Sequence, residues 1–163
     1  MADSDRVTKL YQEFPEKFRS IILSTVSAEG IPQASYAPFL IDGDKTIYIY
    51  VSGLSAHTAN LKHTSRASVL LIEDEAETKE IFARRRLTYE CTASPLPRDT
   101  AQWHTLIDRF EQNFGQVIGL MKGLPDFQLF QLRPQAGQFV VGVGAAYRVS
   151  VNDLNNLEPR RQN

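Results

Sequence analysis

Three consecutive arginines precede an apolar run, and their spacing is the first sign of chemistry in this sequence. Arg84, Arg85 and Arg86 fall within IFARRRLTYECTA (81–93), which is rich in β-branched and aromatic residues and predicts one long β-strand. Alternation places Arg85 on an otherwise apolar face with Leu87, whereas Arg86 takes the opposite face. A guanidinium in apolar surroundings needs an anionic partner, either a ligand phosphate or carboxylate or an acidic side chain. The alternative is a basic surface strand paired with the acidic EDE loop.

A second polar group surrounds the start of a short predicted helix. The run SGLSAHT carries Ser52, Ser55 and His57, and we expect the helix to extend from Ser55 to about Lys62. Backbone N–H groups at a helix start can face an anion, and the two serines add hydroxyls. These three residues are therefore candidate anion ligands. The alternative is a helix capped by Ser55, with His57 on a solvated face.

The other chemically capable residues give weaker signals. Asp126 follows Gly123 and Pro125 in LPDF, where residue type alone indicates a turn or cap. His57 and His63 are six positions apart and do not share a helical face, so we expect no metal site. The single cysteine lies within a strand pattern and reads as a small core residue.

Short β-rich runs joined by turns organise the chain around these residues. Their connections are too short for parallel crossovers, so we expect an antiparallel arrangement. The expected strands are 19–27, 31–41, 46–52, 66–74 and 81–93, with closing strands within 127–134 and 137–151. Apolar spacing predicts a helical N-terminal arm over 4–16 and a helix over about 103–114, capped by Asp99 or Thr100. Six or seven such strands with two or three helices indicate a small closed or half-open β-barrel.

Length and composition set the outer limits. The chain has 163 residues, which predicts a single domain over 1–163 with a polar tail at 152–163. Eighteen basic residues oppose nineteen acidic ones, and this balance argues against binding to nucleic acid or anionic membrane. One cysteine favours a reducing compartment. Without a signal pattern or a long apolar run, we expect a cytoplasmic protein.

An ordered set of motifs carries a family resemblance. The set is SxLSxHTxNL, IEDE, RRRLT and PDF, and the similarity extends from about Lys17 to Val149. The chain resembles the haem-utilisation proteins of the HugZ/HutZ type. These belong to the FMN-binding split-barrel superfamily, in which the pyridoxamine-phosphate oxidases are distant relatives.

The resemblance implies a mainly β fold, an antiparallel six- or seven-stranded split β-barrel with flanking helices that works as a homodimer. It also implies haem or FMN at the dimer interface. In the related oxidases, the region of His57 helps to hold the flavin phosphate. The resemblance favours Arg86 as the ligand residue, whereas alternation favours Arg85, and a β-bulge would reconcile the two. In haem-degrading members, an acid at the position of Asp126 hydrogen-bonds the haem-ligating histidine of the other subunit.

Two departures from the family pattern leave the ligand open. The haem-degrading members carry the ligating histidine in a C-terminal tail, but this chain has histidines only at 57, 63 and 104 and ends EPRRQN. Either the tail has been lost, or haem binds otherwise, or haem is not the ligand. The oxidases clamp the FMN phosphate with arginine and lysine, where this chain has Ser35 and Leu40.

Three functions therefore stand as hypotheses. The first is haem-iron utilisation with oxygen-dependent haem degradation. The second is an FMN-binding oxidoreductase, and the third is a haem or flavin carrier without turnover.

Overall fold

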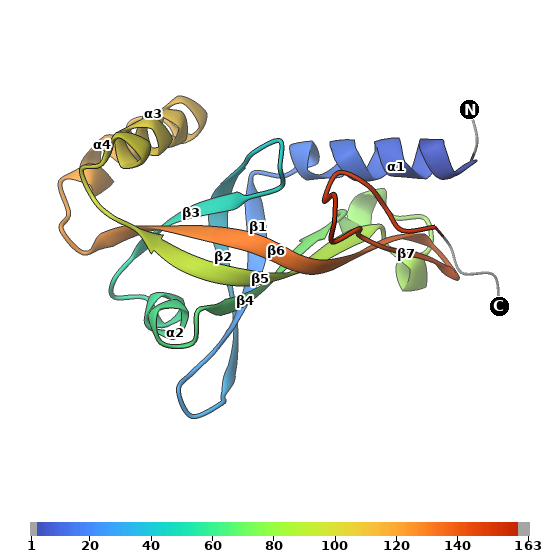
Figure 1. The fold of residues 1–163 in the computed structure, drawn as a ribbon, viewed down its shortest axis with the longest axis horizontal. Helices are drawn as coiled ribbons and strands as arrows, with labels where there is room; N and C mark the ends of the chain where they lie inside the picture. The colour runs from blue at the N-terminus through green and yellow to red at the C-terminus, as the bar shows by residue number, and fades with distance from the viewer. Residues whose placement is uncertain (1–2, 160–163) are drawn as a thin grey trace.

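Seven antiparallel strands dominate the computed structural model, which describes residues 3–159 (Figure 1). The strands are β1 Ser20–Val26, β2 Pro32–Ile41, β3 Ile47–Ser52, β4 Arg66–Ile72, β5 Arg86–Leu96, β6 Phe127–Gly142 and β7 Ala145–Arg148. The helices are α1 Asp3–Glu13, α2 Ala56–Thr64, α3 Ala101–Phe114 and α4 Val117–Lys122. Short 3-10 helices occupy Phe14–Lys17, Glu75–Glu77 and Ile81–Ala83.

The long strand β6 closes the barrel. The strand order is β3-β2-β1-β4-β5-β6-β7, and an additional pairing of β3 with β6 joins the first six strands into a ring. Strand β3 covers one edge of β6 from Phe127 to Leu132, and β7 pairs with β6 from Gln138 onward. The predicted six- or seven-stranded antiparallel barrel is thus confirmed as a closed barrel of six strands with a seventh. Closure leaves few unpaired strand edges.

Two apolar clusters stabilise the barrel, one inside it and one on its outside. In the barrel interior, Tyr11 of α1 packs against Phe139 of β6. A second cluster lies between α3 and the sheet, where Phe110 packs against Tyr50 of β3. Residues 47–51 of β3 are all buried because each face of the strand contacts one of these clusters. The C-terminal end of β3, where Ser52 lies, is therefore held from both sides.

The predicted strand over 81–93 is wrong at its start. Strand β5 begins at Arg86, opposite Ile72, the last residue of β4. Before that point no β4 residue is available as a partner, and the chain instead forms the short 3-10 helix Ile81–Ala83. Along β5 the register shifts between Glu90 and Cys91, and a second irregularity lies in β6 between Val140, the partner of Arg86, and Gly142. Arg85 therefore precedes the strand, and alternation does not determine its direction.

The segment after β7 packs back onto the barrel. Val149 pairs with Leu157 in an isolated bridge, and Leu154 lies against the barrel core. The Tyr11 hydroxyl donates to the Leu154 carbonyl and lies 2.6 Å from the Tyr89 hydroxyl. Of the predicted polar tail, residues 160–163 lie outside the described part of the chain. Within residues 3–159, no helix has the length and apolar character needed to cross a membrane.

Candidate functional site

The first candidate group joins the end of β3 to the start of β6. The Ser52 hydroxyl donates to Oδ2 of Asp126 over 2.9 Å, and the backbone N–H of Gly53 donates to the Asp126 carbonyl over 2.8 Å. A Cβ at Gly53 would lie only 2.8 Å from that carbonyl oxygen, so the close approach requires glycine. The sequence-predicted residues Ser52 and Asp126 are therefore in direct contact. The second carboxylate oxygen of Asp126 makes no hydrogen bond to any described residue.

Exposed leucines flank this pair. Leu54 is 91% exposed and follows directly after Gly53, while Leu124 precedes Asp126 by two residues and is also exposed. Leu120 on α4 adds a third exposed leucine. Exposed apolar groups beside a fixed carboxylate are a common feature of surfaces that bind a ligand or another chain. This end of the molecule thus offers both an acid and an apolar surface.

His57 is half-buried and turned toward β2. Its Nδ1 lies 3.0 Å from the Ser35 hydroxyl, and that hydroxyl donates to the Leu23 carbonyl over 3.2 Å. Since the hydroxyl proton is already used, Nδ1 of His57 carries the proton and donates to Ser35. Burial lowers the pKa of His57, so its neutral form is favoured. Its Nε2 is shielded from solvent without a hydrogen-bond partner.

The start of α2 leaves the Ser55 hydroxyl free. Ser55 occupies the N-cap position, but its side chain makes no capping hydrogen bond, so the alternative of a helix capped by the Ser55 hydroxyl does not hold. Thr58 stabilises the turn instead, because its hydroxyl donates to the Ser52 carbonyl over 2.6 Å. Ser55 and His57 are thus placed near Ser52 by the same turn, and only Ser55 keeps an uncommitted side chain.

The three arginines differ sharply in their partners. The guanidinium of Arg84 donates to the Glu73 carbonyl and pairs with Glu75 over 3.2 Å. Arg86 donates to the Arg84 carbonyl over 3.0 Å. The guanidinium of Arg85 has no partner among the described residues, and its Nε is shielded from solvent. The alternative of pairing with the acidic loop therefore applies to Arg84 alone.

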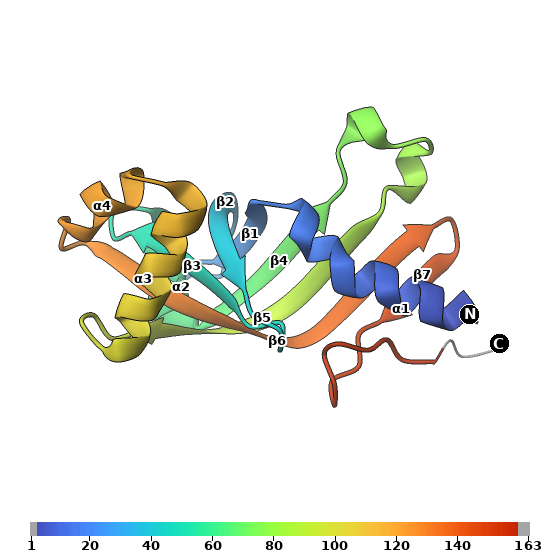
Figure 2. The same cartoon turned by 90° about the horizontal axis from the view of Figure 1, so that it is seen from above.

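The arginines and the Asp126 group lie at opposite ends of β6. Arg86 pairs with Val140, near the end of β6, whereas Ser52 pairs with Phe127 at its start. At about 3.3 Å per residue, these thirteen steps along the strand correspond to roughly 40 Å. Figure 2 shows the β4–β5 connection and the α3–α4 pair at opposite ends of the molecule. Within one subunit, the two groups are too far apart to touch a single small ligand.

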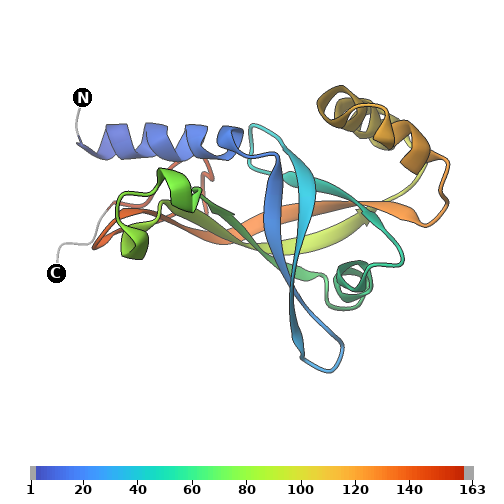
Figure 3. The ribbon, with the colours of Figure 1, turned by 180° about the vertical axis from the view of Figure 1, so that it is seen from behind.

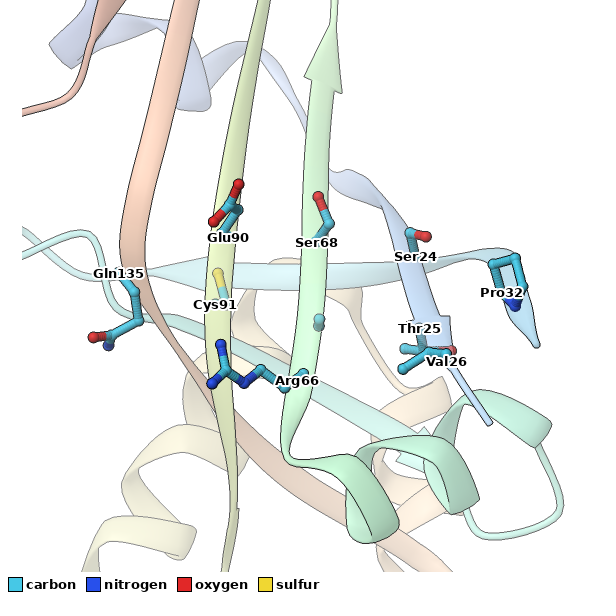
Figure 4. Close-up of a pocket in the computed structure, with 10 residues that line it drawn as sticks. Ser24, Thr25, Val26, Pro32, Arg66, Ser68, Glu90, Cys91 and Gln135 are labelled. Atoms are coloured by element: carbon cyan, nitrogen blue, oxygen red, sulfur yellow. The ribbon is translucent and has the colours of Figure 1, made fainter. Parts of the chain in front are cut away.

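A hollow of about 280 Å³, lined by both polar and apolar side chains, lies on the outer face of the sheet between these ends (Figure 4). Ser24, Ser68 and Glu90 follow one another across β1, β4 and β5. Arg66 and Glu90 line the hollow, and neither side chain makes a hydrogen bond or ion pair with a described residue. This face carries an uncompensated cation and an uncompensated anion on adjacent strands.

Sequence reasoning missed Glu73 and Phe82. From the sequence, Glu73 is interpreted as part of the acidic EDE loop. Phe82 is interpreted as part of the strand over 81–93. Glu73 instead contacts both Arg84 and Arg85, and Phe82 stands almost fully exposed on a 3-10 turn. The available signal was the order of the chain, in which an acid follows the end of one strand and the arginines lead into the next.

The closed six-stranded barrel with its extra strand, carrying polar groups at both ends, defines a split-barrel protein. Comparison with known families sharpens this assignment. The chain belongs to the pyridoxamine 5′-phosphate oxidase family, whose model matches residues 7–141.

Individual relatives are also similar over most of the chain. The haem oxygenase HutZ of Vibrio cholerae serotype O1 is 40% identical over 143 residues, which is 88% of this chain and 81% of HutZ. A crystal structure of V. cholerae HutZ, described as a haem storage protein, superposes with a TM-score of 0.74 at 34% identity, covering 88% of this chain and 99% of that one. The crystal structure of Campylobacter jejuni ChuZ superposes with a TM-score of 0.82 at 30% identity. The match covers 99% of this chain and 68% of ChuZ.

Proposed function

We propose that this protein binds haem between two copies of the chain and takes part in using haem iron in the cytoplasm, with oxygen-dependent haem degradation as its reaction. The observation that carries the proposal is the 40% identity, over 88% of this chain, to a relative described as a haem oxygenase. The arrangement of the polar groups gives independent support.

The residues at the two ends fit the chemistry of haem. Haem has flat apolar faces and an edge with two carboxylates, and a guanidinium fork matches a carboxylate well. Arg85 has such a guanidinium without a partner among residues 3–159. At the other end, the carboxylate of Asp126 keeps one oxygen free to accept a hydrogen bond from the ligand or from water. We assign His57 no contact with iron, because its Nε2 is shielded from solvent.

Bound haem would supply the iron and the oxygen chemistry. The chain's own part is to hold the anionic edge with Arg85 and Arg86 and to orient a proton donor at Asp126. Ser52 limits the positions of that carboxylate by donating to Oδ2. Ser55 lies on the same turn and adds a free hydroxyl.

We also propose that the binding unit is a homodimer formed through the outer face of β2, β1, β4 and β5. Tyr36, which is 68% exposed, stands opposite Ile22 on this face, and both are large apolar side chains in solvent. In a two-fold interface, Arg66 of one subunit can meet Glu90 of the partner subunit, and the reverse contact forms at the same time. The same symmetry can bring the arginine end of one copy to the Asp126 end of the other.

Two further functions have some support. Storage without turnover is favoured by the description of the solved HutZ structure. Flavin binding is favoured by the family itself, but the side chains fit it less well. Leu40 is only 4% exposed and lies in the α3 cluster, and the Ser35 hydroxyl is occupied by Leu23 and His57. Neither position can offer a cation to a phosphate.

Titration with hemin, followed in the visible spectrum, tests the proposal. We expect a Soret band that saturates near one equivalent per subunit, followed by its loss with iron release when a reductant and oxygen are added. Saturation without loss of the band would indicate storage. A flavin spectrum in the purified protein, with no response to hemin, would contradict the proposal.

A further inference from the structure

We propose that the connection between β4 and β5, residues 73–85, is a preformed recognition element that reads the anionic edge and the flat face of the ligand. In this element Glu73 is a positioning residue that keeps Arg85 available, and Phe82 supplies an aromatic surface. The inference rests on the proposed function and specifies how its ligand is recognised. The ligand class is a planar aromatic ring system that carries a carboxylate or a phosphate.

Glu73 fixes the main chain of Arg85 from two sides. Its Oε1 accepts the Arg85 backbone N–H over 2.9 Å, and its own N–H donates to the Arg85 carbonyl over 2.9 Å. The hydroxyl of Thr78 donates to the Asp74 carbonyl over 2.7 Å and lies 3.4 Å from the same carboxylate oxygen. Glu73 is therefore bound to the backbone of Arg85 and not to its guanidinium.

The neighbouring arginines complete the arrangement. Arg84 is held by the Glu73 carbonyl and by Glu75, and its own carbonyl accepts from Arg86. Of the three guanidiniums, only that of Arg85 makes no contact of this kind with a described residue. An Nε shielded from solvent without a partner is costly and is rarely left so. The two terminal nitrogens of the Arg85 guanidinium are not shielded in this way, so an anionic ligand can reach the cation there and supply the missing counter-charge.

Phe82 adds the second half of the element. Its side chain is 90% exposed, and that of Ile81 beside it is also exposed. The turn that presents them is fixed, because the Glu80 carboxylate accepts the Phe82 N–H over 3.2 Å and the Glu80 carbonyl accepts the Ala83 N–H over 2.9 Å. An exposed aromatic ring on a fixed turn, three residues along the chain from the guanidinium of Arg85, suits a flat aromatic anion.

The placement of the connection leaves it open to an incoming ligand. Figure 2 shows it rising from the barrel beyond the ends of β4 and β5, and Figure 3 shows it beside α1. It lies at the opposite end of the molecule from the Asp126 group. A ligand that contacts both groups would therefore take them from different subunits.

Binding of matched ligand pairs tests the element. The first pair is hemin and hemin dimethyl ester, which lacks free carboxylates, and the second is FMN and riboflavin, which lacks the phosphate. We expect Arg85→Ala to weaken hemin binding at least tenfold and to leave binding of the ester unchanged. We expect Phe82→Ala to weaken hemin and its ester alike. If the ligand is a flavin, the same selectivity will appear between FMN and riboflavin.

Two variants of Glu73 separate positioning from folding. Glu73→Gln keeps an acceptor oxygen for the Arg85 N–H and should retain hemin affinity within about threefold. Glu73→Ala should reproduce the selective loss of hemin over its ester. Arg133→Ala, at an exposed arginine elsewhere on the barrel, is the matched charge control and should change neither.

The outcomes distinguish this inference from the proposed function. Normal hemin binding in Arg85→Ala, or an equal loss of hemin and its ester, would overturn the inference and leave haem binding intact. Selective recognition of FMN over riboflavin, with no hemin binding, would overturn the proposed function and support the element.

Discussion

Ser52 and Asp126 are 74 residues apart in the chain, yet the hydroxyl of one donates to the carboxylate of the other over 2.9 Å. This contact ties the end of β3 to the start of β6 at the point where the barrel closes. It places an acid with one free oxygen beside exposed leucines, and it is the strongest local support for a functional role of Asp126.

Changing Asp126 should affect turnover more than binding. Asp126→Asn keeps an oxygen that accepts from Ser52, so the fold should be retained while the charge is lost. We expect haem degradation to slow by about tenfold or more, typical of losing a proton-handling group, with hemin affinity nearly unchanged. Single-turnover spectra with reductant and oxygen measure this. An unchanged rate would remove Asp126 from the chemistry.

The Ser52 contact should also contribute to stability. Ser52→Ala removes two hydrogen bonds of the hydroxyl, the partly buried one that it donates to Asp126 and the exposed one that it accepts from the Leu54 N–H, and we expect the free energy of unfolding to fall by about 1 kcal/mol. Urea denaturation measures the change, with Ser20→Ala at the exposed start of β1 as the matched control. Equal stabilities of the two variants would show that the contact is not maintained in solution.

His57 should make the protein less stable in acid. Burial lowers the pKa of His57 below the usual value near 6.5, so the unfolded chain binds a proton at this residue more tightly than the folded chain does. Stability is therefore lost as pH falls through about 6.5, by less than the roughly 1.4 kcal/mol per pH unit set by one fully linked proton. Urea denaturation between about pH 7.5 and 5.5 should show a shallower loss for His57→Gln than for the unmodified protein. His63→Gln, at an exposed position, should keep the full dependence, and parallel curves for the protein and His57→Gln would refute the prediction.

Gly137 should tolerate no side chain. A Cβ there would lie 2.8 Å from Cδ1 of Tyr89 and 2.9 Å from Cγ2 of Val149. Forcing a methyl group into this contact should cost about 1–3 kcal/mol of unfolding free energy, because packed interiors yield little. Gly43→Ala, where a Cβ would meet nothing within 4 Å, is the control for thermal denaturation. Equal melting temperatures of the two variants would show that Tyr89 moves aside freely.

The proposed dimer face can be tested through Tyr36. Tyr36→Glu places a negative charge beside Ile22 on the proposed dimer face and should shift the protein toward the monomer in sedimentation. Hemin binding should become at least tenfold weaker, because the proposed site needs both subunits. Val143→Glu alters a similarly exposed residue on the β6–β7 turn, which is 81% exposed, and should leave the dimer intact. A Tyr36→Glu protein that stays dimeric would place the interface elsewhere.

Local pattern predicted the barrel well but the contacts poorly. Alternation correctly placed Leu87 on the buried face, because side-chain direction alternates regularly once a strand has begun. It failed for Arg85, because the start of β5 is set by where β4 ends. The contacts of Glu73 with Arg85 and of Ser52 with Asp126 join separate strands and leave no periodic trace in the sequence.

We propose that one ligand is held by Arg85 and Arg86 of one subunit and Asp126 of the partner subunit. Single-turnover haem degradation tests this in a mixed dimer, purified through two different tags, that pairs an Arg85→Ala/Arg86→Ala subunit with an Asp126→Ala subunit. One of its two sites then combines intact arginines with an intact Asp126. We predict that half of the sites in the mixed dimer bind hemin tightly and degrade it at the unmodified rate, whereas the double-arginine homodimer binds hemin weakly and the Asp126→Ala homodimer binds it but degrades it at least tenfold more slowly. A mixed dimer with no active site would contradict a site shared between subunits.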